Sequence, residues 1–174
     1  MVFQMSRRQM PRHPQNPLAL KLETLDDDVE LVNYINRLLS ADSHSVNRLI
    51  DKTSRSGYRR VHDHLADTLD KLISTLDKLI SRPEVGSGEL KGSLLSLSKT
   101  LILVEYQLAR KQISDDLANT LKDIIRKLMS DISKALESKE PTRFIEELKK
   151  LKEEVERART IIDCLAVLVY REKR

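Results

Sequence analysis

The stretch that decides the fold is residues 94–111, LLSLSKTLILVEYQLARK, which is the most apolar helical run in the chain. Within it, residues 101–104 read LILV, and four consecutive residues cover the whole circumference of an α-helix. A helix on the surface of a protein keeps one side polar. We therefore expect other helices to surround this one, and we expect Tyr106, Arg110 and Lys111 to mark where it reaches water.

The composition is typical of a helical bundle. Hydrophobic residues make up 40% of the 174 residues, but aromatic residues only 3%, and the chain has only 4 Gly. Aliphatic seams with few aromatics and 33% charged residues favour helices over β-sheet. We predict an all-α fold, a bundle of five or six helices, with a chain long enough to bury a sizeable core.

Apolar residues recur at helical spacing in six segments. The heptad TLDKLIS occurs twice in succession, at 68–74 and 75–81, and indicates a coiled-coil-like seam that we interpret as one wall of the bundle. The last segment becomes apolar in its second half, so we expect it to enter the bundle there. We expect helices at about 24–39, 46–50, 58–81, 94–111, 115–136 and 142–170.

The domain organisation follows from the prolines and glycines. Residues 1–24 carry three of the five prolines and several arginines, and we interpret them as a flexible basic tail, or alternatively as an arm that reaches a partner. Residues 25–174 are expected to form a single domain. The stretch 82–92, RPEVGSGELKG, either separates sub-lobes 25–82 and 89–174 or is a long loop within one bundle.

The chain has the features of a cytoplasmic protein. Its single cysteine, Cys164, excludes an internal disulfide and suits a reducing compartment. Residues 1–22 lack the apolar core of a signal peptide, and no apolar run approaches the ~20 residues of a membrane span. We expect a cytoplasmic location and no membrane partner.

No catalytic or metal-binding pattern stands out. His62 and His64 point to different faces of a helix and have no cysteine or HExxH partner, so we interpret them as surface histidines. Cys164 lies in an apolar run, which favours a buried thiol over a nucleophile. There is no Gly-rich phosphate loop and no nucleophile elbow. We expect no enzymatic activity, no cofactor and no metal.

Basic residues give the better indication of function. The net charge of +4 is compatible with binding to phosphates, provided that lysines and arginines converge in space. Arg110 follows Tyr106 by one turn; an exposed pair of this kind can stack on a base and hold a phosphate, whereas a buried tyrosine would bond a neighbouring carbonyl. Ordinary solvated helices also carry such residues. The candidate nucleic-acid contacts are Arg59, Arg60, Arg110, Lys111, Lys122, Arg126, Lys149 and Lys150.

The C-terminal half carries a recognisable series of motifs. Residues 103–110 read LVEYQLAR, an amphipathic helix follows over 117–136, and residues 164–170 read CLAVLVY. In this order the motifs resemble the small helical subunit (Csm type) of type III-A CRISPR effector complexes, over about 80 residues from Leu94. The family has a basic residue upstream of the tyrosine, for which Lys99 is the nearest candidate.

The resemblance implies a non-catalytic subunit of a ribonucleoprotein complex. Copies would self-associate as a filament beside larger subunits that hold guide RNA, with a basic face along the target RNA. Arg110 would contact RNA, and Tyr106 and Tyr170 would be structural. The small subunits of type III-B and type I-A effectors have a similar size and helicity. The alternative from a different class is a helical scaffold or adaptor that binds protein partners or itself, without nucleic acid.

Overall fold

The computed structural model describes residues 28–39 and 43–172; the expected tail, 1–24, lies outside them. Within these ranges the chain is all-α, with six α-helices, one short 3-10 helix and no strand, which confirms the predicted fold class. The helices are α3 (Asp28–Leu39), α4 (Ser43–Ile50), α5 (Arg55–Ser81), α6 (Gly88–Ala109), α7 (Asp115–Glu137) and α8 (Pro141–Glu172), with the 3-10 helix η2 (Pro83–Val85) between α5 and α6.

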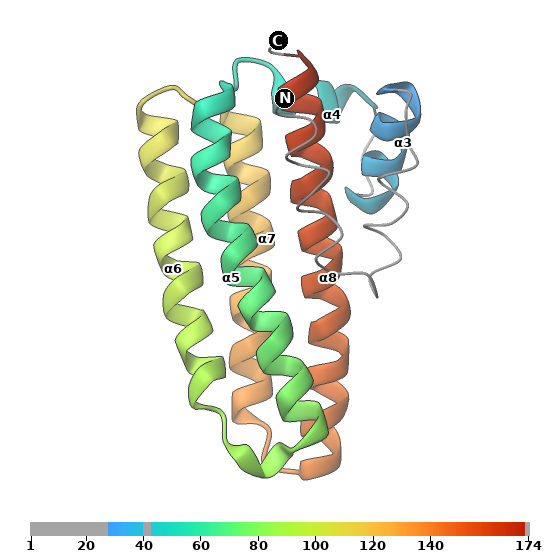
Figure 1. Cartoon of the computed structure of the whole chain (residues 1–174), viewed down its shortest axis with the longest axis vertical. Coiled ribbons are helices and arrows are strands. Elements are labelled where there is room, and N and C mark those ends of the chain that lie inside the picture. Colours follow the sequence, from blue (N-terminus) through green and yellow to red (C-terminus); the bar gives the residue numbers. More distant parts are fainter. Residues whose placement is uncertain (1–27, 40–42, 173–174) are drawn as a thin grey trace.

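The four long helices form an antiparallel bundle (Figure 1). Around it, α5 packs against α6, α6 against α7, α7 against α8, and α8 against α5. The short helices α3 and α4 lie beside α8, and α4 also contacts α7. No helix among the described residues is long and apolar enough to cross a membrane.

Two serine caps and a close turn fix one end of this bundle. Ser54 Oγ accepts the Gly57 N–H at 3.0 Å and caps α5, and Ser114 Oγ accepts the Leu117 N–H at 3.0 Å and caps α7. The Ser54 N–H also donates to the Gln112 carbonyl at 2.8 Å. These bonds hold the start of α5 against the turn between α6 and α7.

The helix that is buried on every side is α8, over its second half. Every residue from 158 to 170 is buried, and α3, α4, α5 and α7 all contact this helix. The second half of the last helix therefore enters the bundle, as its apolar sequence predicts. The centre of the core lies around this part of α8.

The expectation that other helices surround α6 is wrong. Val104 is buried, but Ile102 is 69% exposed and Leu95 is 61% exposed. Among the described helices, α6 packs against α5 and α7, which cover one side of it and leave the opposite side in solvent. Apolar residues on all sides of this helix therefore do not indicate a central position.

Candidate nucleic-acid interface

One end of the bundle brings together four chain segments. The starts of α5 and α7 and the ends of α6 and α8 meet there (Figure 1). Four of the eight basic residues selected from the sequence lie in these segments: Arg59 and Arg60 in the first turns of α5, and Arg110 and Lys111 directly after α6. All four are exposed. We call these four residues the basic end.

Tyr106 and Arg110 form an exposed pair at the edge of the basic end. Arg110 Nη1 donates to the Tyr106 hydroxyl at 3.0 Å, and the guanidinium carbon lies 5.4 Å from the centre of the Tyr106 ring. Tyr106 is 50% exposed, so of the two alternatives that the sequence left open, the exposed pair is the one present. A guanidinium has five N–H donors, and the contact with Tyr106 leaves others directed to solvent.

The backbone after α6 turns sharply because Lys111 adopts a left-handed conformation, with φ of 58°. This conformation is uncommon for a residue other than glycine, and it ends the helix as a C-terminal cap does. The Gln112 N–H then donates to the Gln107 carbonyl at 2.9 Å. The turn holds Lys111 on the outside of the bundle, beside Arg110.

A second tyrosine anchors the arginines of α5. The guanidinium carbons of Arg55 and Arg59 lie 5.6 Å and 6.0 Å from the centre of the Tyr170 ring, near the end of α8. Burial raises the pKa of Tyr170, against the opposing influence of a hydrogen bond with Arg59. Arg55 belongs to the basic stretch TSRSGYRR at 53–60 but was not selected as a contact; its spacing of one turn before Arg59 is the signal that could have identified it.

The structure does not bring the other four selected residues to the basic end. Lys122 forms an ion pair with Glu105 at 2.6 Å, and only 14% of its side chain is exposed, so its charge is already matched within the chain. Arg126 is exposed on α7, one turn further from the basic end. Lys149 and Lys150 are exposed on the first half of α8, near the opposite end of the bundle.

A buried charge cluster between α5 and α8 was not expected from the sequence. His62 Nε2 lies 2.8 Å from Asp163 Oδ1, and Arg159 Nη1 donates to the same oxygen. Arg159 Nε also donates to Asp70 Oδ1 at 2.9 Å. The interpretation of His62 as a surface residue is therefore wrong: it is 8% exposed, because it follows Tyr58 by one turn on the face that packs against α8.

The electrostatics of this cluster point to a structural role. Burial lowers the pKa of His62, but the hydrogen bond with Asp163 and the nearby Asp63 carboxylate, 3.6 Å from Nδ1, outweigh it and leave the pKa raised. Cys164 is buried, as the sequence predicts, and burial raises the pKa of its thiol well above its usual range. No group of three metal-ligating side chains occurs within residues 28–39 and 43–172. The cluster links α5 to α8 through buried hydrogen bonds and ion pairs.

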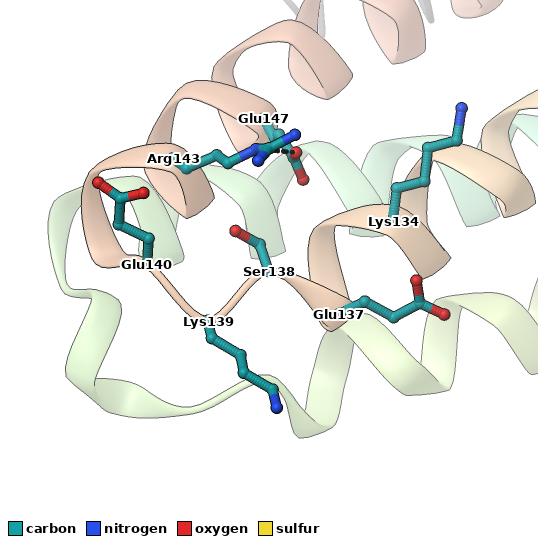
Figure 2. A pocket seen from close by; sticks show the side chains of 7 residues that line it. All are labelled: Lys134, Glu137, Ser138, Lys139, Glu140, Arg143 and Glu147. Carbon is teal, nitrogen blue, oxygen red and sulfur yellow. Dashed lines mark ion pairs between the residues drawn. The ribbon is translucent and has the colours of Figure 1, made fainter.

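The turn between α7 and α8 forms a pocket of about 350 Å³ at the opposite end (Figure 2). Three basic and three acidic side chains surround it, and Arg143 pairs with Glu147 at 3.4 Å. Figure 2 shows Lys139 and Glu137 directed away from that pair. The charges neither converge nor share a sign, so this pocket is a poorer phosphate site than the basic end.

Comparison with known proteins identifies no relative. No family model matches the chain, and neither a curated protein nor a solved structure matches it significantly.

Proposed function

We propose that this protein binds single-stranded RNA, without sequence preference, through the basic end and Tyr106. The observation that carries the proposal is the exposed pair of Tyr106 and Arg110, at the end of the bundle that also presents Arg59 and Arg60. Arginines that converge on one surface attract phosphates, and an aromatic ring beside them offers a stacking platform for a base.

Each residue has a specific role in this proposal. Arg110 donates to a phosphate oxygen while its contact with Tyr106 restricts its rotamers, which lowers the entropy lost on binding. Lys111, the next residue along the chain, and Arg60, at the same end of the bundle, add positive charge. The Tyr106 ring stacks on one base through a face that every base can contact, so the binding does not discriminate between sequences.

The proposed biological setting is a CRISPR ribonucleoprotein effector, in which this chain is the non-catalytic small subunit. The support is the resemblance of residues 103–110 and 164–170 to the type III-A small subunit. Its partners are then the guide and target RNA and the other effector subunits, in the cytoplasm. A single copy with three or four phosphate contacts binds weakly, and repeated copies along one RNA raise the overall affinity.

The test is binding of a fluorescent 30-nucleotide RNA, measured by anisotropy at 50 and 200 mM salt. Three or four phosphate contacts predict that log K falls with log salt concentration with a slope of about −2 to −3. Arg110→Glu is expected to weaken binding at least ~10-fold at low salt. Tyr106→Ala is expected to weaken it by about 1 to 3 kcal/mol while the salt slope stays unchanged.

The matched control is Arg82→Glu, because Arg82 is exposed near the opposite end of the bundle. The control makes the same change in net charge and is expected to alter affinity less than twofold. Equal losses in the two variants would show that overall charge, not the basic end, holds the RNA. Absence of binding at 50 mM salt would refute the proposal and favour a scaffold that binds protein alone.

A further inference from the structure

A groove of about 400 Å³ lies between α5 and α6, the two helices that carry most of the basic end. Five of the nine residues that line it are serines or threonines, and two are lysines, Lys71 and Lys78. Hydroxyl groups both donate and accept hydrogen bonds, and lysines donate to anions. This lining is therefore suited to a ligand that carries hydroxyl groups and negative charge.

Two side-chain contacts fix the register of α5 and α6, which run antiparallel (Figure 1). His64 Nδ1 lies 2.7 Å from Thr100 Oγ1, and Thr75 Oγ1 donates to Glu89 Oε2 at 3.2 Å. The residue numbers add to 164 in both pairs. Residues of α5 and α6 whose numbers have this sum therefore lie at the same level along the bundle.

Thr68 and Ser96 are such a pair, and both line the groove. Thr68 is only 5% exposed and Ser96 is half-buried. Neither hydroxyl has a hydrogen-bond partner among the residues that the structure describes. Since most buried polar groups in proteins are hydrogen-bonded, a nearly buried hydroxyl without a partner in the wall of a groove indicates a ligand that supplies one. The two hydroxyls at one level form the centre of a candidate site.

Two exposed lysines flank these hydroxyls. Lys71 lies one turn beyond Thr68 on α5, and Lys99 lies one turn from Ser96 on α6, in the direction of the basic end. In the register above, the lysines are about 9 Å apart along the bundle. Lys99 has no acidic partner in the described part of the chain. Lys71 pairs with Asp67 at 3.1 Å, but these side chains are 77% and 66% exposed, and such a pair contributes little and leaves Lys71 available to another anion.

The groove continues from the proposed RNA site. At about 100° per residue, Arg60 and Lys71 point within about 20° of each other on α5, and Tyr106 and Lys99 do so on α6. These pairs extend over about 16 Å and about 10 Å of their helices. At its far end the groove contains the Glu89 carboxylate, which repels phosphate. A strand that enters from the basic end therefore finds its last favourable position between the two lysines.

We propose that this groove binds one ribose of an RNA strand that the basic end holds. The Thr68 and Ser96 hydroxyls bond the ribose 2′-hydroxyl, and Lys71 and Lys99 contact the phosphates on either side of it. The inference rests on the proposed function and adds the choice of RNA over DNA, because DNA lacks the 2′-hydroxyl. A contact with the sugar does not depend on the base, so it is compatible with binding without sequence preference.

The first experiment compares the 30-nucleotide RNA with DNA of the same base sequence, by anisotropy at 50 mM salt. The unchanged chain is expected to bind RNA about 2- to 10-fold more tightly than DNA. The double variant Thr68→Val/Ser96→Ala is expected to lose this factor for RNA and to keep its affinity for DNA. The matched control is Thr120→Val, since Thr120 is half-buried on α7, outside the groove. It is expected to keep the preference for RNA.

The second experiment tests the flanking phosphate contacts. Lys71→Gln is expected to weaken binding of RNA and of DNA alike, by about 3- to 10-fold at 50 mM salt. The matched control is Lys127→Gln on α7, because Lys127 is 63% exposed and also pairs at 3.1 Å with a carboxylate four residues away, that of Asp131. This control is expected to change affinity less than twofold. Because Lys71 is exposed, its variant tests the groove even where the double variant loses stability.

Equal affinity of the unchanged chain for RNA and DNA would overturn the ribose site. Equal losses in Thr68→Val/Ser96→Ala and Thr120→Val, or in Lys71→Gln and Lys127→Gln, would also overturn it. In each of these cases, RNA binding that is lost in Arg110→Glu would leave the proposed function standing. Absence of RNA binding by the unchanged chain at 50 mM salt would overturn both, so the two failures are distinguishable.

Discussion

Asp163→Asn is the sharpest test of the buried cluster that joins α5 to α8. The Asp163 carboxylate accepts from both His62 and Arg159 through one oxygen, and its side chain is only 7% exposed. The amide of asparagine is uncharged and keeps the shape of the side chain. It therefore removes the counter-charge of two buried donors without creating a cavity.

The expected cost follows from what the neighbours lose. Removal of one partner from a buried ion pair costs about 3 to 5 kcal/mol, because the remaining charge stays buried without compensation. Arg159 keeps its bond to Asp70 at 2.9 Å, so the lower end of this range applies. A loss of about 3 kcal/mol in a domain of this size corresponds to a fall in Tm of about 6 to 12 °C.

The substitution also changes the pH dependence of stability. The pKa of His62 is raised in the folded protein, so the folded state holds its proton more tightly than the unfolded chain does. The stabilisation is fully present below the unfolded pKa of 6.5 and is lost as the pH rises through the folded pKa. The free energy of unfolding of the unchanged chain is therefore expected to fall above pH 6.5, by at most about 1.4 kcal/mol per pH unit. Asp163→Asn is expected to flatten this slope.

Urea denaturation followed by circular dichroism, at several values between pH 5.5 and 8.5, measures both effects. The control is Asp67→Asn on α5, which removes a carboxylate from a surface pair with Lys71 whose side chains are 66% and 77% exposed. That change is expected to cost at most about 0.5 kcal/mol. If Asp163→Asn costs no more than Asp67→Asn, the buried cluster does not stabilise the bundle and the reasoning is refuted.

Three further experiments test the packing of the bundle. Gly57→Ala would place a Cβ 2.5 Å from Gln112 Cβ and is expected to destabilise the fold by about 1 to 3 kcal/mol. In Gly92→Ala the new Cβ meets nothing within 4 Å, and this change is expected to stabilise α6 by about 0.5 to 1 kcal/mol. Thermal melts measure both variants, and equal shifts in Tm would contradict the prediction. Tyr58→Phe removes a buried 2.7 Å bond to a carbonyl of α8 and should cost about 1 to 2 kcal/mol by the same melts; an unchanged Tm would exclude a contribution from that bond. Cys164 should react with a thiol reagent only in denaturant, and rapid reaction of the native protein would show that the second half of α8 is accessible.

Periodicity and capping residues were enough to predict most of the helices. The apolar seam of α7 could be predicted because it is local: each residue of the seam lies within one turn of the next. The same holds for the single turn that separates Tyr106 from Arg110. Local spacing also identified the pair that carries the proposed RNA contact.

The buried cluster could not be predicted, because its partners are distant in the chain. His62 and Asp163 are 101 residues apart, and nothing in either neighbourhood specifies the other. A weaker signal was present in α8: Arg159 and Asp163 are four residues apart inside an otherwise apolar stretch. Two opposite charges at that spacing on a buried helix indicate an internal ion pair, and its remaining hydrogen-bonding groups need a partner on another helix.

The error over α6 has a physical cause. Residues 101–104 put apolar side chains on every side of the helix. An apolar side chain is more stable out of water, but the sequence does not specify what covers it. Among the described helices, α5 and α7 cover the side of Leu97 and Val104, whereas Leu95 and Ile102 are exposed on the other side. A helix that solvent alone surrounded there would tolerate lysine or glutamate at both positions. The apolar residues on the outward side of α6 are therefore not explained by packing against α5 and α7, and a hydrophobic pattern alone does not place a helix at the centre of a bundle.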